Sequence, residues 1–325
     1  MSIHATRRAF AALAAIGALA AFGVTAAHAQ SDYPNRPIEL VVPFQPGGGT
    51  DALARSFADA TRKYMTQSMV VVNKAGGSGA IGWQDVISSK PDGYRLAVVT
   101  VEVTTLPHMG IGKFTYEDFQ PIARLNADPA AITVRADAPW NTIEEFLAAA
   151  HAKPGTVAVG NAGPGSIWHL AASALEEKTG TKFNHVPFQG AGPAVLALMG
   201  GHIDAVAVSP AEVTTYIAAG KMKMLAVMAD QRVKNFEKVP TMKERNIDLS
   251  IGTWRGLAAP KNTPPQVIAY LKNLAQKASN EPAFRETLDK QNLGFAYADD
   301  VQFKQAMARD DASFKVLIQK LGIKN

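Results

Sequence analysis

A glycine-rich loop near the N-terminus is the stretch of this sequence best suited to hold an anion. The apolar run 38–42 leads to Pro43-Phe44-Gln45-Pro46, then to glycines 47–49 and to Thr50-Asp51. Pro43 closes a buried strand because proline cannot donate to a sheet ladder, and Thr50 is a good N-cap for a following helix. The glycine amides are not covered by side chains and lie at the positive end of that helix. The pattern therefore predicts a site for a carboxylate or a phosphate.

The same order of strand, glycine loop, hydroxyl cap and helix returns later in the chain. The apolar run 157–160 is followed by Asn161-Ala162-Gly163-Pro164-Gly165-Ser166 and then by His169. Ser166 is predicted to cap the helix rather than to act as a nucleophile, because capping is a common role of serine at such positions. Ligands of open α/β sheets bind beyond the carboxyl ends of the strands, so both loops are predicted to face a cleft.

Strands that alternate with helices indicate a parallel, doubly wound α/β sheet. The predicted strands are 38–42, 69–73, 95–100, 157–160, 184–187, 203–208 and 224–228. The predicted helices include 50–64, 82–88, 211–219, 265–279, 281–291 and 299–321. Another helix is predicted to open at 141–145, with Thr142 and Glu145 at capping-box spacing. The chain passes into a second unit around 127–131 and returns to the first near 254–260. We therefore expect one lobe made of 30–129 plus 251–325 and another made of 130–250.

The first 29 residues are predicted to be a signal peptide. Arg7-Arg8 is followed by an Ala-rich apolar run and by Ala27-His28-Ala29, a small-x-small cleavage site, so the mature chain would begin at Gln30. The start resembles a twin-arginine export signal, and the choice between that route and general secretion stays open. The sequence contains no cysteine, which excludes disulfides, thiol catalysis and a lipoprotein anchor. The formal net charge of +5 is not gathered into a block, so nucleic acid is not an expected partner.

Motifs for catalysis and cofactors fail on their context. Residues 77–82 fit G-x-G-x-x-G, but Asp92 lies in a turn where the dinucleotide fingerprint needs an acid at the end of a strand. Neither Ser78 nor Ser166 lies in G-x-S-x-G, and no pair of histidines has the spacing of a metal site. We expect no catalytic residue, no cofactor and no metal.

Three large side chains have two possible roles each. Trp83 and Trp168 each follow a glycine loop, so each is either a core aromatic or part of a ligand pocket. Arg255 is either an ion-paired arginine or a clamp for a second carboxylate of the ligand, held in a bidentate fork.

The motifs together resemble the Bug-type extracytoplasmic substrate-binding proteins of the tripartite tricarboxylate transporter family. The resemblance covers the mature chain in order. It rests on Tyr33-Pro34-x-Arg36-Pro37, Pro43-Phe44-x-Pro46-Gly47-Gly48-Gly49-Thr50-Asp51, Asn73-Lys74-x-Gly76-Gly77, Pro91-Asp92-Gly93-Tyr94, Gly165-Ser166 with His169-Leu170, Gly190-Ala191-Gly192-Pro193-Ala194, Trp254-x-Gly256-Leu257 and Thr263-Pro264.

This resemblance implies an α/β, two-lobed periplasmic-binding-protein fold. Each lobe would be a mainly parallel sheet flanked by helices, with the ligand cleft between the lobes. It further implies a monomer in the periplasm that binds a small organic carboxylate, does no chemistry on it, and delivers it to membrane transporter subunits. The alternatives are a ligand-sensing receptor of the same fold and a secreted hydrolase.

The resemblance and the residue chemistry together give one set of expected ligand contacts. They are Phe44, Pro46, Gly47, Gly48, Ser78, Trp83, Thr104, Thr105, Gly163, Ser166, Trp168, Ala191, Gly192, Ser209 and Arg255. The two tryptophans and the arginine are large where the family usually has small residues. They suggest a bulky or aromatic dicarboxylate as the ligand.

Overall fold

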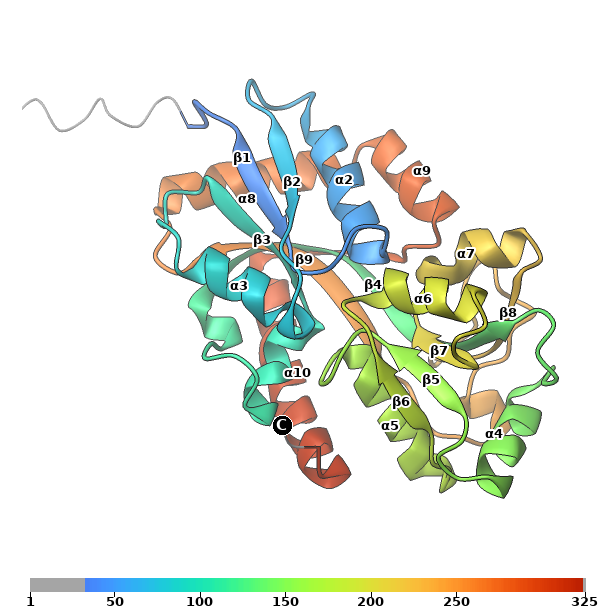
Figure 1. The fold of residues 1–325 in the computed structure, drawn as a ribbon. Coiled ribbons are helices and arrows are strands. Elements are labelled where there is room, and N and C mark those ends of the chain that lie inside the picture. Colours follow the sequence, from blue (N-terminus) through green and yellow to red (C-terminus); the bar gives the residue numbers. More distant parts are fainter. Residues whose placement is uncertain (1–32, 324–325) are drawn as a thin grey trace, which may run out of the picture. The chain divides into compact units, whose positions relative to one another are not determined.

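Two groups of parallel strands carry the glycine loops at their carboxyl ends (Figure 1). The computed structural model describes residues 33–323, so the predicted signal peptide lies outside the described residues. In the first sheet, β1 (Ile38–Val42) pairs in parallel with β2 (Met69–Asn73) and β3 (Arg95–Thr100). In the second sheet, β5 (Ala158–Asn161) pairs in parallel with β6 (Asn184–Pro187) and β7 (Ala205–Val208). Both triplets are βαβ units, in which helices connect parallel neighbours.

A single long strand, β4 (Phe119–Arg135), belongs to both sheets. Its first part pairs antiparallel with β9 (Gly252–Pro260), up to Pro129 opposite Gly252. Its second part pairs antiparallel with β7 and with β8 (Met222–Met228), beginning at Ala130. The short strand β10 (Phe295–Asp299) also runs antiparallel to β4. Both sheets are therefore mixed, because β4, β8, β9 and β10 pair antiparallel with their neighbours.

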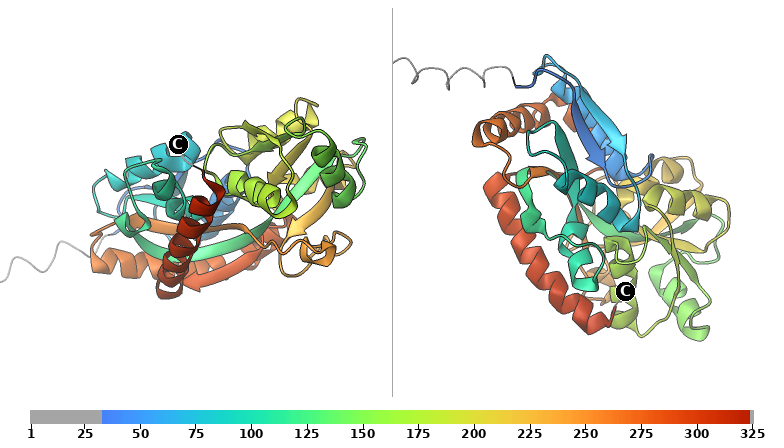
Figure 2. Two further views of the ribbon diagram at one scale, coloured as in Figure 1. Left: turned by 90° about the horizontal axis from the view of Figure 1, so that it is seen from below. Right: turned by 60° about the vertical axis from the view of Figure 1, so that its left-hand side comes forward.

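Helices with one apolar face cover these sheets. The first sheet carries α2 (Gly49–Thr61), α3 (Ala80–Ile87), α8 (Pro265–Ser279) and α9 (Pro282–Lys290), and the second carries α4 (Ile143–Ala152), α5 (Ile167–Thr179), α6 (Ala191–Met199) and α7 (Pro210–Ala218). In α2 the buried positions include Leu53, Ala54 and Phe57, the spacing of an amphipathic helix. The final helix, α10 (Asp300–Leu321), packs on β4 and reaches α5 (Figure 2).

The start of α2 differs from the prediction. Its N-cap is Gly48, which provides no side-chain cap, and the helix begins at Gly49 rather than after Thr50. Two of the glycines are thus available to the loop, and the third already belongs to the first turn of the helix. The Thr50 hydroxyl does not cap the helix, because it accepts a hydrogen bond from Arg255 instead.

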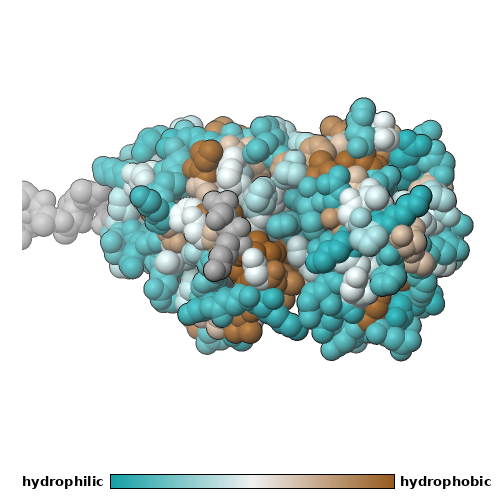
Figure 3. Space-filling model, turned by 60° about the horizontal axis from the view of Figure 1, so that its bottom comes forward, coloured by the Kyte–Doolittle hydropathy of each residue, from teal (hydrophilic) through white to brown (hydrophobic). Residues whose placement is uncertain are grey.

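The apolar side chains of the described residues lie mainly inside, in one large cluster that includes β3, β4 and α5. On the face drawn in Figure 3, hydrophilic residues cover most of the surface, and apolar residues form one patch near its centre and smaller ones along its upper edge. Among residues 33–323, no helix combines the length and the apolar character needed to cross a membrane.

The capping box predicted at the start of α4 is present and can be tested. The Thr142 hydroxyl accepts from the Glu145 amide at 3.2 Å, and the Glu145 carboxylate accepts from the Thr142 amide at 3.3 Å. We expect Thr142→Ala to lower the free energy of unfolding by about 1 kcal/mol, or roughly 2–4 °C in the melting point. Thr156→Ala is the control, because this exposed hydroxyl only donates to a turn carbonyl. Equal melting points for the two variants would contradict this account.

Candidate functional site

A small cavity lies where the two glycine loops meet. It has a volume of about 20 Å³, enough for about one water molecule. Its walls come from the β1–α2 loop, the end of β3, the start of α5, and residues of α6, α7 and β9. The lining residues are Phe44, Gln45, Gly48, Gly49, Thr50, Asp51, Thr100, Glu102, Ala162, Trp168, Ala191, Glu212, Thr253 and Arg255.

The β1–α2 loop is held by an acid of its own helix. Gly47 has φ +92°, a conformation that favours glycine, and its amide donates to Asp51 Oδ2 at 3.2 Å. Asp51 also accepts from Arg55 and from Asn73. Burial opposes ionisation of Asp51, but the hydrogen bonds from Arg55, Asn73 and Gly47 outweigh it and lower its pKa. The loop is therefore fixed before any ligand arrives.

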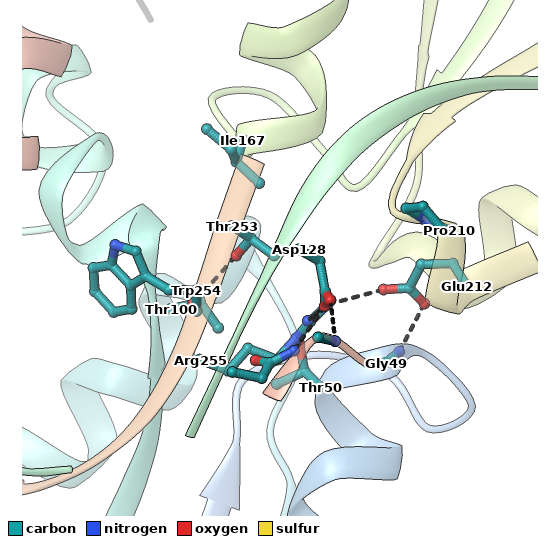
Figure 4. A network of polar contacts seen from close by, with 12 residues as sticks. Gly49, Thr50, Thr100, Asp128, Ile167, Pro210, Glu212, Thr253, Trp254 and Arg255 are labelled. Atoms are coloured by element: carbon teal, nitrogen blue, oxygen red, sulfur yellow. Dashed lines mark hydrogen bonds and ion pairs between the residues drawn. The ribbon is translucent and has the colours of Figure 1, made fainter. Parts of the chain in front are cut away.

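The anion position of this loop is filled by a carboxylate of the chain itself. The Gly49 amide donates to Glu212 Oε2 at 2.7 Å (Figure 4). Glu212 lies in the first turn of α7, in the half of the fold that is built on the second sheet. Burial raises the pKa of Glu212, and the nearby guanidinium of Arg255 counteracts this rise. That a ligand carboxylate binds here stays a prediction, and the carboxylate that the structure places at this loop is that of Glu212.

Arg255 connects the two halves of the site. Its Nε donates to Thr50 Oγ1 at 2.9 Å, its Nη1 donates to Asp128, and its Nη2 donates to Glu212 Oε1 at 3.1 Å. The Arg255 side chain is only 2% exposed and that of Glu212 3%. Of the two roles considered from the sequence, the structure shows the ion-paired one. Clamping a ligand carboxylate stays a prediction, because both ends of the guanidinium are engaged by acids.

The second glycine loop also places a backbone amide against an acid, but here the loop belongs to the second sheet and the acid to the first. Ser166 is the N-cap of α5, as predicted, and accepts from the His169 amide at 3.2 Å. The Ile167 amide donates to Glu102 Oε1 at 3.0 Å. Glu102 follows β3 in the first sheet and also accepts from the Thr100 hydroxyl. Burial is the main influence on Glu102 and raises its pKa, although these hydrogen bonds oppose it.

Close backbone approach fixes where this second loop lies. The Ser78 hydroxyl donates to the Pro164 carbonyl at 2.6 Å, and a Cβ on Gly163 would lie 2.7 Å from that hydroxyl oxygen. The Gly165 amide donates to His169 Nδ1 at 3.1 Å, so this imidazole is neutral in the structure. Burial of His169, with His185 nearby, lowers its pKa to about 4, which keeps it an acceptor at neutral pH.

The structure brings many of the predicted ligand contacts together. Phe44, Gly48, Trp168, Ala191 and Arg255 line the cavity, and Pro46, Gly47, Gly163 and Ser166 belong to the two loops that form it. A Cβ on Gly192 would lie 3.3 Å from the Gly48 nitrogen, so the start of α6 also adjoins the first loop. Thr104 and Thr105 are fully buried, and Thr105 donates to the Gly165 carbonyl at 3.3 Å. Ser209 is the buried N-cap of α7, and its hydroxyl has no hydrogen-bond partner among residues 33–323.

Trp83 was among the expected ligand contacts, but the structure places it in the core. Its side chain is fully buried, and its indole N–H donates to the Val98 carbonyl at 3.0 Å. Phe44 and Phe114 pack edge-on against it. It therefore packs behind Phe44 and against Gly79, with its indole N–H directed to β3, and it does not line the cavity.

The acids of the site were not among the predicted contacts. Asp128 lies on β4, and Glu102 and Glu212 each lie just beyond the carboxyl end of a parallel strand. The position of Glu102 and Glu212 after an apolar strand can be read from the sequence. A search for acids at the strand ends, beside the search for glycines, would have found Glu102 and Glu212. Residues 33–323 contain no cluster of acids and histidines arranged to hold a metal ion.

Comparison with known proteins gives consistent matches along the chain. The family model described as "Tripartite tricarboxylate transporter family receptor" matches residues 53–323. The UPF0065 protein of the gbd 5′ region in Cupriavidus necator is 37% identical over 96% of each chain. A TctC solute binding protein from Polaromonas, solved with no ligand, is 60% identical, covers 89% of this chain and 99% of its own, and has a TM-score of 0.66.

Two further solved structures have higher TM-scores at lower identity. The periplasmic binding protein BugD is 31% identical, covers 90% of this chain and 99% of its own, and has a TM-score of 0.86. MatC from Rhodopseudomonas palustris, with bound malate, is 26% identical, covers 88% of this chain and all of its own, and has a TM-score of 0.81.

The buried acid of the second loop predicts a dependence of stability on pH. Because burial raises the pKa of Glu102 above its ordinary 4.5, its contribution to stability is full below about pH 4.5 and is lost as the pH rises through the raised value. A glutamine can accept from Ile167 and donate to Thr100 without a charge. We expect Glu102→Gln to raise the free energy of unfolding at pH 8 relative to the wild type, because the amide forms these contacts without having to carry a buried charge.

The measurement is thermal unfolding of both proteins between pH 5 and pH 8. The stabilisation by Glu102→Gln should shrink toward pH 5. Glu286→Gln, at an exposed position on α9, is the control and should change little at any pH. A variant that is less stable than the wild type at pH 8 would show that the charge of Glu102 supports the fold.

Proposed function

Since the chain belongs to the tripartite tricarboxylate transporter receptor family, we propose that it captures a small organic carboxylate between two lobes and delivers it to a membrane transporter. The membership confirms the resemblance inferred from the sequence motifs and the α/β periplasmic-binding-protein fold. Members of this family are solute-binding receptors and not enzymes. The proposal adds the class of ligand, the partner and the place where the protein works.

One observation carries the choice of a carboxylate. The Gly49 amide and the Arg255 guanidinium converge on one carboxylate group, that of Glu212, at a small cavity, with contacts of 2.7 and 3.1 Å. Charged hydrogen bonds of this kind are the strong ones, and a helix N-terminus favours an anion. MatC, which shares this fold, is described with bound malate, a dicarboxylate. Both facts favour a carboxylate ligand at the meeting point of the loops.

The proposed lobes are 30–129 plus 251–325 and 130–250. In support, β4 exchanges β9 for β7 and β8 as its partner between Pro129 and Ala130. The Polaromonas protein has the higher sequence identity and yet the lower TM-score. Chains that are 60% identical share their fold, so the lower score favours a different arrangement of the same parts. Closure of two lobes around the anion would exclude water and strengthen these contacts.

We further propose that the chain works in the periplasm as a monomer, after removal of residues 1–29. The twin-arginine and general secretory routes are both compatible with this proposal. The finer expectation of a bulky or aromatic dicarboxylate now depends on Trp168, because Trp83 is in the core. Trp168 lines the cavity and is 4% exposed.

The direct test is a thermal-shift screen of residues 30–325 against mono-, di- and tricarboxylates, including aromatic ones. A ligand present at 100 times its dissociation constant adds about 2.7 kcal/mol of stability. In a protein of this size that corresponds to a shift of several degrees. We expect a shift with one class of carboxylate and none with neutral analogues of the same shape. Shifts with neutral compounds alone would contradict the proposal.

A second test concerns the role of Trp168. We expect Trp168→Ala to weaken binding of aromatic carboxylates about tenfold, because stacking on an aromatic face contributes roughly 0.5–1.5 kcal/mol beyond the area buried. Binding of short aliphatic carboxylates should change less. Trp140→Ala is the control, since Trp140 is partly exposed and packs on Phe146, outside the cavity. Isothermal titration of both variants gives the affinities, and equal losses for both ligand classes would contradict stacking.

A further inference from the structure

We propose that Glu212 is an internal competitor of the ligand: its carboxylate occupies the position that a ligand carboxylate takes at the β1–α2 loop. The inference rests on the proposed function and names the residue that sets how tightly carboxylates bind. The ligand would then displace Glu212 from Gly49 and Arg255 rather than bind beside it.

The contacts of Glu212 are those expected of a bound carboxylate. One oxygen accepts from the Gly49 amide at 2.7 Å and the other accepts from Arg255 Nη2 at 3.1 Å. Figure 4 shows the side chain of Glu212 reaching from α7 to the loop, with these donors at its end. A Cβ on Gly49 would lie 3.0 Å from Glu212 Oε1, so the absence of a side chain at Gly49 is what admits the carboxylate.

The charge balance favours displacement over addition. Arg255 faces two buried acids, Asp128 and Glu212, whose side chains are each 3% exposed. Glu102, also buried, lines the same cavity. A ligand carboxylate added to this set would be a fourth acid against one guanidinium, and buried charges without partners are costly. A ligand that takes the place of Glu212 leaves the number of negative charges around Arg255 unchanged.

The available space also favours displacement. A cavity of about 20 Å³ is far smaller than the roughly 300–1,000 Å³ of typical ligand pockets. Glu212 stands on α7, in the half of the fold opposite to Gly49 and Arg255. Separation of the halves would therefore withdraw its carboxylate and open the cavity in a single movement. A ligand that binds while the halves are apart would meet an unoccupied Gly49 amide and an Arg255 freed on one side.

Glu102 differs from Glu212 in its surroundings. Its oxygens accept from the Ile167 amide and from the hydroxyl of Thr100, at the end of the strand that precedes it, and among residues 33–323 it forms no ion pair with an arginine, although the charge of Arg255 acts to lower its pKa. It would stay in place when the halves separate from each other, because Thr100 moves with it. We therefore assign the competing role to Glu212 alone.

The test is isothermal titration of malate, adipate and phthalate into the wild type, Glu212→Ala and Glu212→Gln. Alanine removes the competitor, and we expect binding to tighten by roughly tenfold or more, since a hydrogen bond to a charged group is worth about that factor. Glutamine has one carbonyl oxygen for two donors, so its gain should be intermediate. Glu286→Gln removes an exposed acid from α9 and should leave affinity within about twofold of the wild type.

The outcomes separate this inference from the proposed function. If the wild type binds a carboxylate and both Glu212 variants bind it equally or more weakly, Glu212 is a ligand contact or a bystander and the inference is wrong. If the wild type and all variants bind none of the probes, the proposed function fails and the inference fails with it. Binding by the Glu212 variants alone would support both. Thermal unfolding of each variant confirms that it is folded before titration.

Discussion

The buried guanidinium of Arg255 is the interaction on which the site depends. It lies on β9, is buried, and donates to Thr50 of α2, Asp128 of β4 and Glu212 of α7. A charge buried this deeply persists only with partners of opposite sign, so the position of Arg255 requires the acids around it. Those partners come from segments far apart in the chain. The guanidinium therefore holds the start of α2, the shared strand β4 and the start of α7 at one point.

In each of the two glycine loops, a backbone amide at the start of the helix donates to an acid from the other sheet. The first loop donates its amide to an acid that follows a strand of the second sheet, and the second loop donates to an acid that follows a strand of the first. Each helix N-terminus is thus neutralised by the opposite side, which satisfies backbone donors that would otherwise be buried without partners. Separation of the two sides would break the Gly49–Glu212 and Ile167–Glu102 contacts and return both amides to solvent or to a ligand.

The sequence was sufficient for many of the helices and strands, but not for the partners across the fold. Strands 69–73, 95–100 and 184–187, helix 265–279, the capping box of Thr142 and the Ser166 cap depend on local patterns, and the structure has them as predicted. The long antiparallel strand β4 was missed because half of its pairing is with β9, more than a hundred residues away. The same limit applies to Arg255, whose partners Thr50, Asp128 and Glu212 no local spacing connects. Trp83 and Trp168 follow similar loops, and only the packing of α3 and α5 separates core from cavity.

Under the proposed function, a receptor for carboxylates would gain selectivity from a carboxylate of its own. Donors that stood empty in a closed cavity would bind any small anion, because their charge and dipole do not distinguish shapes. With Glu212 in place, an anion would have to make enough other contacts to offset the hydrogen bonds that Glu212 loses at Gly49 and Arg255. The remaining wall of the cavity, with Trp168, Phe44 and the threonines, offers such contacts to a ligand of the right body. As the proposed competitor, Glu212 would make binding depend on the shape of the ligand more than on its charge, which many solutes share.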